Sequence, residues 1–327
     1  MNRGKGAINQ ICQMLSDLCL GSYYFEAVNV LRNSLLLSSL LCNSESWYNL
    51  TQKDISNLES IDEMLLRKSF SAHSKTAIEL LYLESGNVPI RFILMSRRIN
   101  FLWYILHENE ESLLYKFFKA QCQHPVKSDW VNTVKKDLSD LDIKLNFEQI
   151  KNISKNVFKN IVKEKVKVKA LSYLKNLQAT HSKSKDIDYK ELRLQEYLMP
   201  GNKLTIQQKC FIFAARSRMI DVYCNFKLGR TDFLCRKCKS FDEDQKHLLS
   251  CSALQNNCMI QTTNIPEYEH LFSADSRKVA AIGSILMSQF KKLTANDNDI
   301  TMCTANDQRN VSANIVCAAV ASATDLD

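Results

Sequence analysis

Residues 87–105 read NVPIRFILMSRRINFLWYI, and the spacing of their side chains predicts an amphipathic helix. Pro89 stands in the first turn of this expected helix, where the N–H group that proline lacks would have no helical partner. Behind it, apolar side chains recur every three or four residues, as one face of a helix requires. Arg97 and Arg98 leave this face. The apolar face comprises Ile90, Ile93, Leu94, Phe101, Leu102 and Ile105.

Similar periodicity along the rest of the chain predicts a fold made mostly of helical bundles. Residues 51–54 and 205–208 have the pattern of a capping box, in which two side chains satisfy backbone N–H groups at a helix start. A last helix is expected from about residue 276 to residue 292. The sequence contains only 7 Gly and 4 Pro, too few for the many tight turns of a β-rich fold. The predicted fold class is therefore all-α.

Residues 151–185 are strongly basic, with ten Lys and a single Glu. Several of these Lys recur at four-residue spacing, which places their ammonium groups on one helical face. Protein surfaces normally mix charges of both signs, so the excess favours contact with a phosphate backbone, without base readout. The alternative is that these lysines form an ordinary solvent-exposed helix face that contributes only to solubility. The row comprises Lys151, Lys155, Lys159 and Lys163.

The net charge of +8 is unevenly distributed. The last 34 residues, 294–327, contain five Asp and one basic residue, and they lack aromatic side chains. This composition predicts a disordered tail. The rest of the chain is correspondingly more basic, which suggests a polyanionic partner.

Cysteine content and hydropathy indicate where in the cell the protein is expected. The N-terminal residues have no apolar signal region behind them, and the twelve Cys are therefore expected as reduced thiols. The most apolar stretch, residues 34–42, is far shorter than the ~20 residues of a membrane-spanning helix and is interpreted as a core helix. We expect an intracellular protein of the cytoplasm or nucleus, without a membrane partner.

The most specific motif is CRKC at residues 235–238, followed after eight residues by HLLSC at residues 247–251. The thiolates of a Cys-x-x-Cys turn can bind one edge of a metal ion. A His and a Cys on one helical turn can complete the tetrahedron that zinc prefers. Four protein ligands leave no position for water, so a structural zinc is expected. The predicted ligands are Cys235, Cys238, His247 and Cys251.

Two alternatives remain open for this segment. Cys258 is close enough in sequence to replace one of the ligands. The cysteines could instead be free buried thiols beside a surface histidine. The flanking residues include Arg236 and Lys237, so a zinc knuckle here would present positive charge.

The knuckle and its neighbours resemble the C-terminal arm of LINE-type (non-LTR) retrotransposon reverse transcriptases. That family carries a similar knuckle, whose His typically stands in a His-Leu-Leu-x-Cys run. Other blocks of this chain resemble the family in the same order, which is stronger evidence than any single block. The likeness covers roughly residues 1–292. The blocks are residues 3–9, which resemble the segment after the palm; 40–47, which resemble the family's "gsE-W" block; 62–67 and 89–102, which resemble its thumb helices; and 213–219, which resemble the helix before the knuckle.

The resemblance implies a division of the chain and a partner. The expected partner is nucleic acid, either RNA or an RNA–DNA primer–template, and no small-molecule substrate is expected. The expected units are a thumb-like helical bundle at 1–110, a Lys-rich helical connection at 111–230, a CCHC zinc knuckle at 231–258, a C-terminal helix at 259–293 and a disordered tail at 294–327.

The polymerase centre of that family has no counterpart in this sequence. The centre uses an aromatic-x-Asp-Asp motif and a further palm Asp to hold two metal ions, whereas this chain contains no Asp-Asp dipeptide. Its first residue corresponds to a point after the palm. The expectation is therefore a remnant of an RNA-directed DNA polymerase that is not itself an enzyme. A gene model that begins too late would also explain the missing palm, and an upstream palm would then make an active polymerase.

Other catalytic chemistry is not indicated by the sequence. It contains no phosphate-loop, dinucleotide-binding, His-Glu-x-x-His or serine-hydrolase motif. Asp62, Glu63 and Arg67 are interpreted as a solvated face of ion pairs. The alternatives to nucleic-acid binding are a helical protein-interaction scaffold and a non-functional transposon fragment. The residues expected to contact nucleic acid are Arg97, Arg98, Lys159, Lys163, Arg216, Arg218, Arg236 and Lys237.

Overall fold

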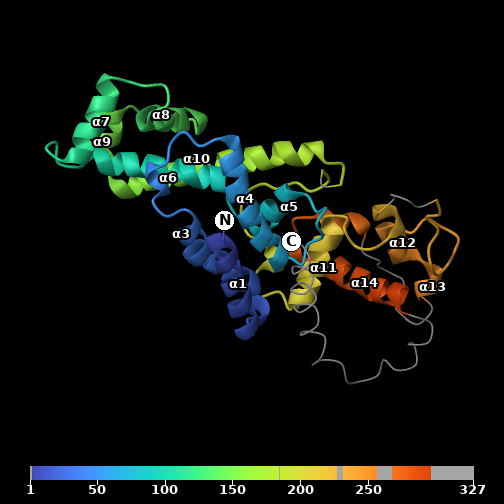
Figure 1. The fold of residues 1–327 in the computed structure, drawn as a ribbon. Coiled ribbons are helices and arrows are strands. Elements are labelled where there is room, and N and C mark those ends of the chain that lie inside the picture. The colour runs from blue at the N-terminus through green and yellow to red at the C-terminus, as the bar shows by residue number, and fades with distance from the viewer. Residues whose placement is uncertain (1, 184, 227–230, 256–266, 296–327) are drawn as a thin grey trace.

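The computed structural model describes residues 2–183, 185–226, 231–255 and 267–295 (Figure 1). In this part of the chain helices are joined by loops, and strand-like pairing is limited to two isolated bridges, Ser85 with Leu194 and Leu234 with Asp242. The predicted all-α fold is confirmed. Cys258 and nearly all of the tail expected to be disordered lie outside the described residues.

The helices follow one another along the whole described chain. The α-helices are α1 (Asn2–Asp17), α2 (Tyr24–Leu31), α3 (Leu37–Leu40), α4 (Gln52–Ser69), α5 (Ile78–Ser85), α6 (Ile90–Leu106), α7 (Leu113–Gln123), α8 (Trp130–Asp140), α9 (Phe147–Lys151), α10 (Lys155–Thr180), α11 (Ile206–Arg216), α12 (Gln245–Ser250), α13 (Ser252–Gln255) and α14 (Ser276–Thr294). The shorter turns are η1 (Gly21–Tyr23), η2 (Arg32–Leu36, a π-helical turn), η3 (Ser44–Ser46), η4 (Glu196–Leu198), η5 (Tyr223–Asn225) and η6 (Tyr268–Phe272).

The predicted helix starts agree with the structure. At α4 the Thr51 hydroxyl accepts a hydrogen bond from the backbone N–H of Asp54, whose carboxylate accepts one from the backbone N–H of Thr51. Thr205 and Gln208 form the same reciprocal pair at the start of α11. The helix expected after Pro89 begins at the next residue. These starts are local patterns, which the sequence displays directly.

Helix α10 runs through the middle of the molecule. In Figure 1, α7, α8 and α9 lie together at one end, and α11 to α14 lie toward the other. A row of buried side chains on α10 packs against α5 and α6. Their four-residue spacing keeps them on one continuous helical face. The row comprises Phe158, Val162, Val166, Ala170, Leu174 and Gln178.

One hydrophobic core joins most of the helices, from Phe25 in α2 to Leu293 in α14. The cysteine-rich segment contributes Leu248 and Leu254 to it, and α12 packs against α14. The segments expected as a thumb-like bundle, a connection, a knuckle and a C-terminal helix therefore all contribute to this core, and residues 1–110 bury two smaller clusters beside it. Residues far apart in the sequence complete one another's packing.

A buried ion pair joins η2 to α4. The guanidinium of Arg32 donates to the Asp62 carboxylate, with Nε 2.6 Å from Oδ1, and both side chains are almost fully buried. The Tyr82 hydroxyl donates to the same carboxylate at 3.0 Å. The interpretation of Asp62 as part of a solvated face was therefore wrong. Its helix is covered by η2 and α5 on the side where the carboxylate lies, and Arg32 supplies the compensating charge that a buried carboxylate requires.

The apolar stretch at residues 34–42 directs its leucines toward the protein interior, whereas its serines and Cys42 are exposed. It forms the end of η2 and the short α3, and Leu36, Leu37 and Leu41 are buried. This agrees with its interpretation as a core segment. Among the described helices, none combines the length and apolar character that crossing a bilayer would require.

Candidate metal centre

A short hairpin shapes the backbone around the first cysteine. The N–H of Cys235 donates to the carbonyl of Phe241 at 2.8 Å, and the N–H of Glu243 donates to the carbonyl of Phe233 at 2.7 Å. Lys239 adopts a left-handed conformation, with φ of +56°, and its N–H donates to the carbonyl of Cys235 at 3.0 Å. The chain thus folds back tightly after the Cys-x-x-Cys turn.

Helix α12 supplies the other two candidate ligands. Asp244 caps its first turn, because the Asp244 carboxylate accepts a hydrogen bond from the N–H of His247 at 2.6 Å. His247 lies within the helix and Cys251 follows its last residue. Helix α13 starts directly afterwards, and the N–H of Leu254 donates to the carbonyl of Cys251 at 3.0 Å. Cap and turn together fix the spacing of the two ligands.

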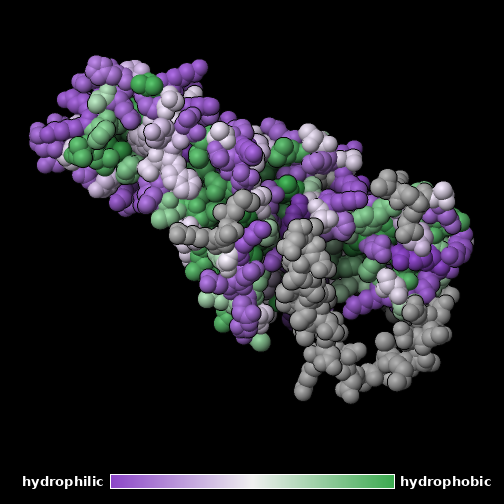
Figure 2. Space-filling model, viewed as in Figure 1, coloured by the Kyte–Doolittle hydropathy of each residue, from purple (hydrophilic) through white to green (hydrophobic). Residues whose placement is uncertain are grey.

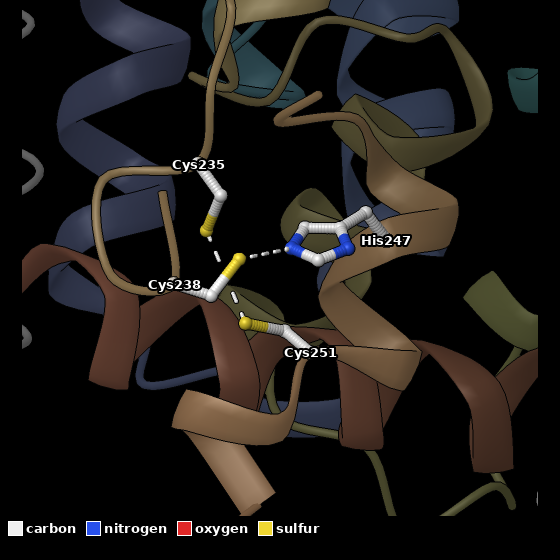
Figure 3. Close-up of side chains that lie close together, drawn as sticks. All are labelled: Cys235, Cys238, His247 and Cys251. Carbon is white, nitrogen blue, oxygen red and sulfur yellow. Dashed lines mark hydrogen bonds between the residues drawn. The ribbon is translucent and has the colours of Figure 1, made fainter. Parts of the chain in front are cut away.

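The ligand atoms of Cys235, Cys238, His247 and Cys251 all lie within 4.8 Å of one another (Figure 3). The Sγ atoms of Cys235 and Cys251 are 3.9 Å apart, and Cys238 Sγ lies 3.3 Å from His247 Nε2. A tetrahedron with Zn–S bonds of about 2.3 Å and Zn–N bonds of about 2.0 Å has edges of roughly 3.8 and 3.5 Å. The four residues lie close enough to bind one metal ion, and their spacing is compatible with zinc.

Burial and hydrogen bonding differ between the cysteines. Backbone N–H groups of Ser240 and Phe241 stabilise the Cys238 thiolate and lower the pKa of Cys238 to about 6. Cys251 is fully buried, and burial, followed by the nearby Cys235, raises the pKa of Cys251 to about 11. A metal cation would favour the thiolate form at both positions, because its charge compensates that of sulfur.

Arg236 forms an ion pair with the buried carboxylate of Glu243 inside the cysteine-rich segment. The fully buried Glu243 accepts hydrogen bonds from the backbone N–H and the Nε of Arg236, at 2.9 and 3.0 Å, and from the N–H of Tyr223 at 3.2 Å. Lys237 Nζ donates to the carbonyl of Ala295 at 3.1 Å, just after α14. Both residues expected to contact nucleic acid from the knuckle therefore have partners within the chain.

Arg98 and Arg216 lie in the protein interior, which corrects the expectation that they contact phosphate. Arg98 Nε donates to Asp137 at 2.6 Å, and Arg216 Nε donates to Glu84 at 2.7 Å. The two arginines are only 7% and 2% exposed. Their helices are covered on more than one side, so a position outside the main apolar face can still be buried. Periodicity alone does not reveal this.

Two further arginines occupy intermediate positions. Arg218 forms an ion pair with Asp186 and has a positive φ of +53°. Arg97 is half-buried, and its Nη1 donates to the carbonyl of Leu41 and, at 3.2 Å, to the hydroxyl of Ser44. Arg97 has no carboxylate partner within 4.0 Å among the described residues. Of these two, only Arg97 retains a charge that is not compensated within the described chain.

The lysine row on α10 differs from its expected extent at its first member. Lys151 ends α9 and lies 3.7 Å from the carboxylate of Glu110, so it belongs to another helix. Lys159 and Lys163 are exposed on α10, as expected. The row continues one turn further, to Lys167, which lies beyond the extent expected from the sequence. Its four-residue spacing from Lys163 is the signal that could have identified it.

Comparisons of the chain with protein-family models, curated proteins and solved structures found no match. The likeness to LINE-type reverse transcriptases therefore rests on the sequence motifs alone. The candidate metal-binding cluster and the basic surface of α10 remain the two features that suggest a function.

Proposed function

We propose that this chain binds the phosphate backbone of RNA or of an RNA–DNA primer–template through α10, with a zinc knuckle as a structural element. In this proposal it corresponds to the thumb, connection and knuckle of a LINE-type reverse transcriptase, and the described residues carry no catalysis. The likeness of the knuckle motif and the order of the sequence blocks support this assignment. The surface of α10 supports it independently.

The observation that carries the proposal is the row Lys155, Lys159, Lys163 and Lys167. It runs parallel to the buried row of α10 and extends for about 18 Å, since an α-helix rises about 1.5 Å per residue. None of the four has a carboxylate within 4.0 Å in the described chain, where the ion pairs of α10 are those of Lys165 and Lys175. Uncompensated ammonium groups in a row suit the regular charge of a nucleic-acid backbone.

Zinc is the metal we propose for the cysteine–histidine cluster. Three thiolates and one imidazole are soft or borderline ligands, which select zinc over the oxygen-preferring Mg²⁺ and Ca²⁺. Four protein donors fill the tetrahedron, so the ion would hold the hairpin against α12 without binding a substrate. The expected content is one zinc ion per chain, measurable by elemental analysis.

A salt-dependent binding experiment tests the proposed function. The zinc-loaded chain is titrated against a fluorescently labelled RNA–DNA primer–template, and anisotropy is recorded across a salt series. We expect affinity to fall steeply with salt, because each phosphate contact releases a counterion. The double variant K155Q/K159Q should lower the magnitude of the slope of log K against log salt by roughly 1.5, since each lost contact removes about 0.7 to 0.9.

A matched control distinguishes the row from net charge alone. The variant K165Q/K175Q removes the same two charges from the same helix, but Lys165 and Lys175 are already paired, with Asp142 at 3.0 Å and Asp188 at 2.9 Å. Its salt slope should stay close to that of the wild type. If both variants change the slope equally, the lysine row is not the binding surface. If the folded wild type binds nothing at low salt, the proposed function is wrong.

Exposed apolar side chains favour protein interaction as a second candidate function. Leu113 and Phe117 lie one turn apart on α7 and are 72% and 63% exposed. Figure 2 shows hydrophobic surface at the end of the molecule where α7 lies. Contiguous apolar surface of this kind can bind a partner. A failure of nucleic-acid binding, together with a discrete photo-crosslink from position 113 that is absent from exposed position 190, would favour this candidate.

A further inference from the structure

A cleft of about 380 Å³ lies beside the lysine row. One wall comes from α10, through Lys163 and Lys167, and another from α6, through Arg97. The loop between α5 and α6 contributes Asn87, and Arg32 of η2 also lines the space. Segments widely separated in the sequence thus bring several basic side chains to one concave site.

The charge of this cleft is strongly one-sided. Its lining among the described residues includes four basic side chains and no Asp or Glu. Arg32 is compensated, because its guanidinium pairs with the buried Asp62. Arg97, Lys163 and Lys167 have no carboxylate within 4.0 Å in the described chain. Three uncompensated cations therefore border one partly enclosed space, where screening by water is weaker than on an open surface.

Arg97 is already oriented for an additional hydrogen-bond acceptor. Its Nη1 donates to the carbonyl of Leu41 and the hydroxyl of Ser44, which anchors the guanidinium at the end of α3. Its Nε and Nη2 make no hydrogen bond to the described residues. A planar guanidinium with two unused donor nitrogens suits the oxygens of a phosphoryl group.

We propose that this cleft binds a single phosphoryl group, held by Arg97, Lys163 and Lys167. An anion there would relieve the mutual repulsion of the three cations and use the remaining donors of Arg97. The inference rests on the proposed function, in which the phosphoryl group belongs to a nucleic-acid backbone. Free inorganic phosphate offers the same chemistry, so the test separates the two sources.

The test compares two double variants on one helix. K163Q/K167Q removes two cations from the cleft, and K155Q/K159Q removes two from the same row outside it. Against the labelled primer–template at about 100 mM salt, we expect the second to weaken binding about thirtyfold, as a slope lower by roughly 1.5 implies at that salt, and the first about tenfold more than the second. The difference arises because hydrogen bonds between ions add to the long-range attraction only inside the cleft. Circular dichroism checks that both variants are folded.

The outcomes separate the cleft from the general binding function. Equal weakening by both variants overturns the cleft proposal and leaves backbone binding in place. If the wild type binds no primer–template, the proposed function fails, and inorganic phosphate becomes the probe. A rise in the thermal midpoint with phosphate, relative to chloride at equal ionic strength, that is lost only in K163Q/K167Q would support a site for free phosphate. With neither primer–template binding nor that rise, the cleft binds no phosphoryl group.

Discussion

Arg216 connects three parts of the chain through one buried side chain. From the end of α11 its Nε donates to Glu84 of α5 at 2.7 Å, and its Nη1 donates to the carbonyl of Leu271 in η6. Glu84 also accepts a hydrogen bond from the Tyr189 hydroxyl at 2.6 Å. Because these groups are buried, loss of one partner leaves the others without compensation.

Replacement of Arg216 should therefore destabilise the fold without changing a nucleic-acid contact. For Arg216→Ala we expect the free energy of unfolding to fall by about 3 to 5 kcal/mol, because Glu84 stays buried without its counter-charge. The control Arg193→Ala removes an arginine that is half exposed and paired with Glu191 and Glu196 on the surface, and should cost at most about 1 kcal/mol. Urea unfolding measures both. Equal losses would contradict the buried ion pair.

The partly buried carboxyl of Glu63 should make the free energy of unfolding depend on pH. Burial raises the pKa of its carboxyl to about 7, from an ordinary value of 4.5. Between these two values the native state binds more protons than the unfolded state. The free energy of unfolding therefore falls as pH rises from about 4.5 to 7, and the penalty is complete above that range.

The variant Glu63→Gln should remove this penalty, because the amide resembles the protonated carboxyl. At pH 8 we expect it to be more stable than the wild type by on the order of 1 kcal/mol, a value reduced by solvent screening of the partly exposed group. At pH 4.5 the two proteins should be about equally stable. The exposed Glu164→Gln serves as a control and should show no such trend. A stability difference independent of pH would count against the protonation of Glu63.

At the scale of elements, the sequence predicts where a helix begins better than it predicts where a helix is interrupted. The capping residues Thr51 and Thr205 marked two starts, because a cap depends on neighbours only three residues away. The break between α9 and α10 was missed, although Ser154 occupies the N-cap position of α10. The lysine spacing continued across the break at Lys151, so periodicity alone joined two helices.

Gly86 ends α5 in a way that other residues cannot. Its φ is +69°, and a Cβ there would lie 2.2 Å from the backbone of Arg193 and Leu194. The same segment pairs with α5 through the hydrogen bond from the N–H of Gln195 to the carbonyl of Glu84, at 3.1 Å. Close backbone approach and left-handed conformation both require glycine here.

A pair of glycine substitutions tests this requirement. Gly86→Ala should destabilise the protein by more than about 1 to 2 kcal/mol, since the backbone strain is joined by a clash with backbone atoms. Gly6→Ala is the control: it lies within α1, a Cβ there would meet nothing within 4 Å, and alanine should stabilise by roughly 0.5 to 1 kcal/mol. Thermal unfolding compares them. A neutral Gly86→Ala would show that the segment at Arg193 can move away.

Across the whole molecule, the sequence was informative where function depends on short spacing. The candidate ligands Cys235, Cys238, His247 and Cys251 lie within 17 consecutive residues, so local structure alone brings them together. The partner of Arg98 is 39 residues away and that of Arg216 is 132 residues away. Such pairings depend on how helices pack, which periodicity does not specify. Both arginines were therefore assigned to the surface although they are buried.

The shared core makes a further prediction about the metal. Cys235 and Cys251 are buried in the core that includes Leu286 of α14, and α14 packs against α11. If zinc binds there, its removal should therefore lower the stability of the helices around the cysteine-rich segment as well. Binding of an ion by the folded state alone contributes about 4 kcal/mol when free zinc is 1,000 times its Kd, so removal should lower the thermal midpoint by several degrees.

Differential scanning calorimetry of the zinc-loaded and chelator-treated chain measures this coupling. We expect one cooperative transition in both samples, lower after chelation and restored when zinc is added, because the knuckle and the helices bury the same core. Cys251→Ser should match the chelated protein and no longer respond to chelator, whereas Cys42→Ser, at an exposed cysteine outside the cluster, should behave as the wild type. If chelation instead moves only a small separate transition, the knuckle folds independently and the metal does not stabilise the helical body.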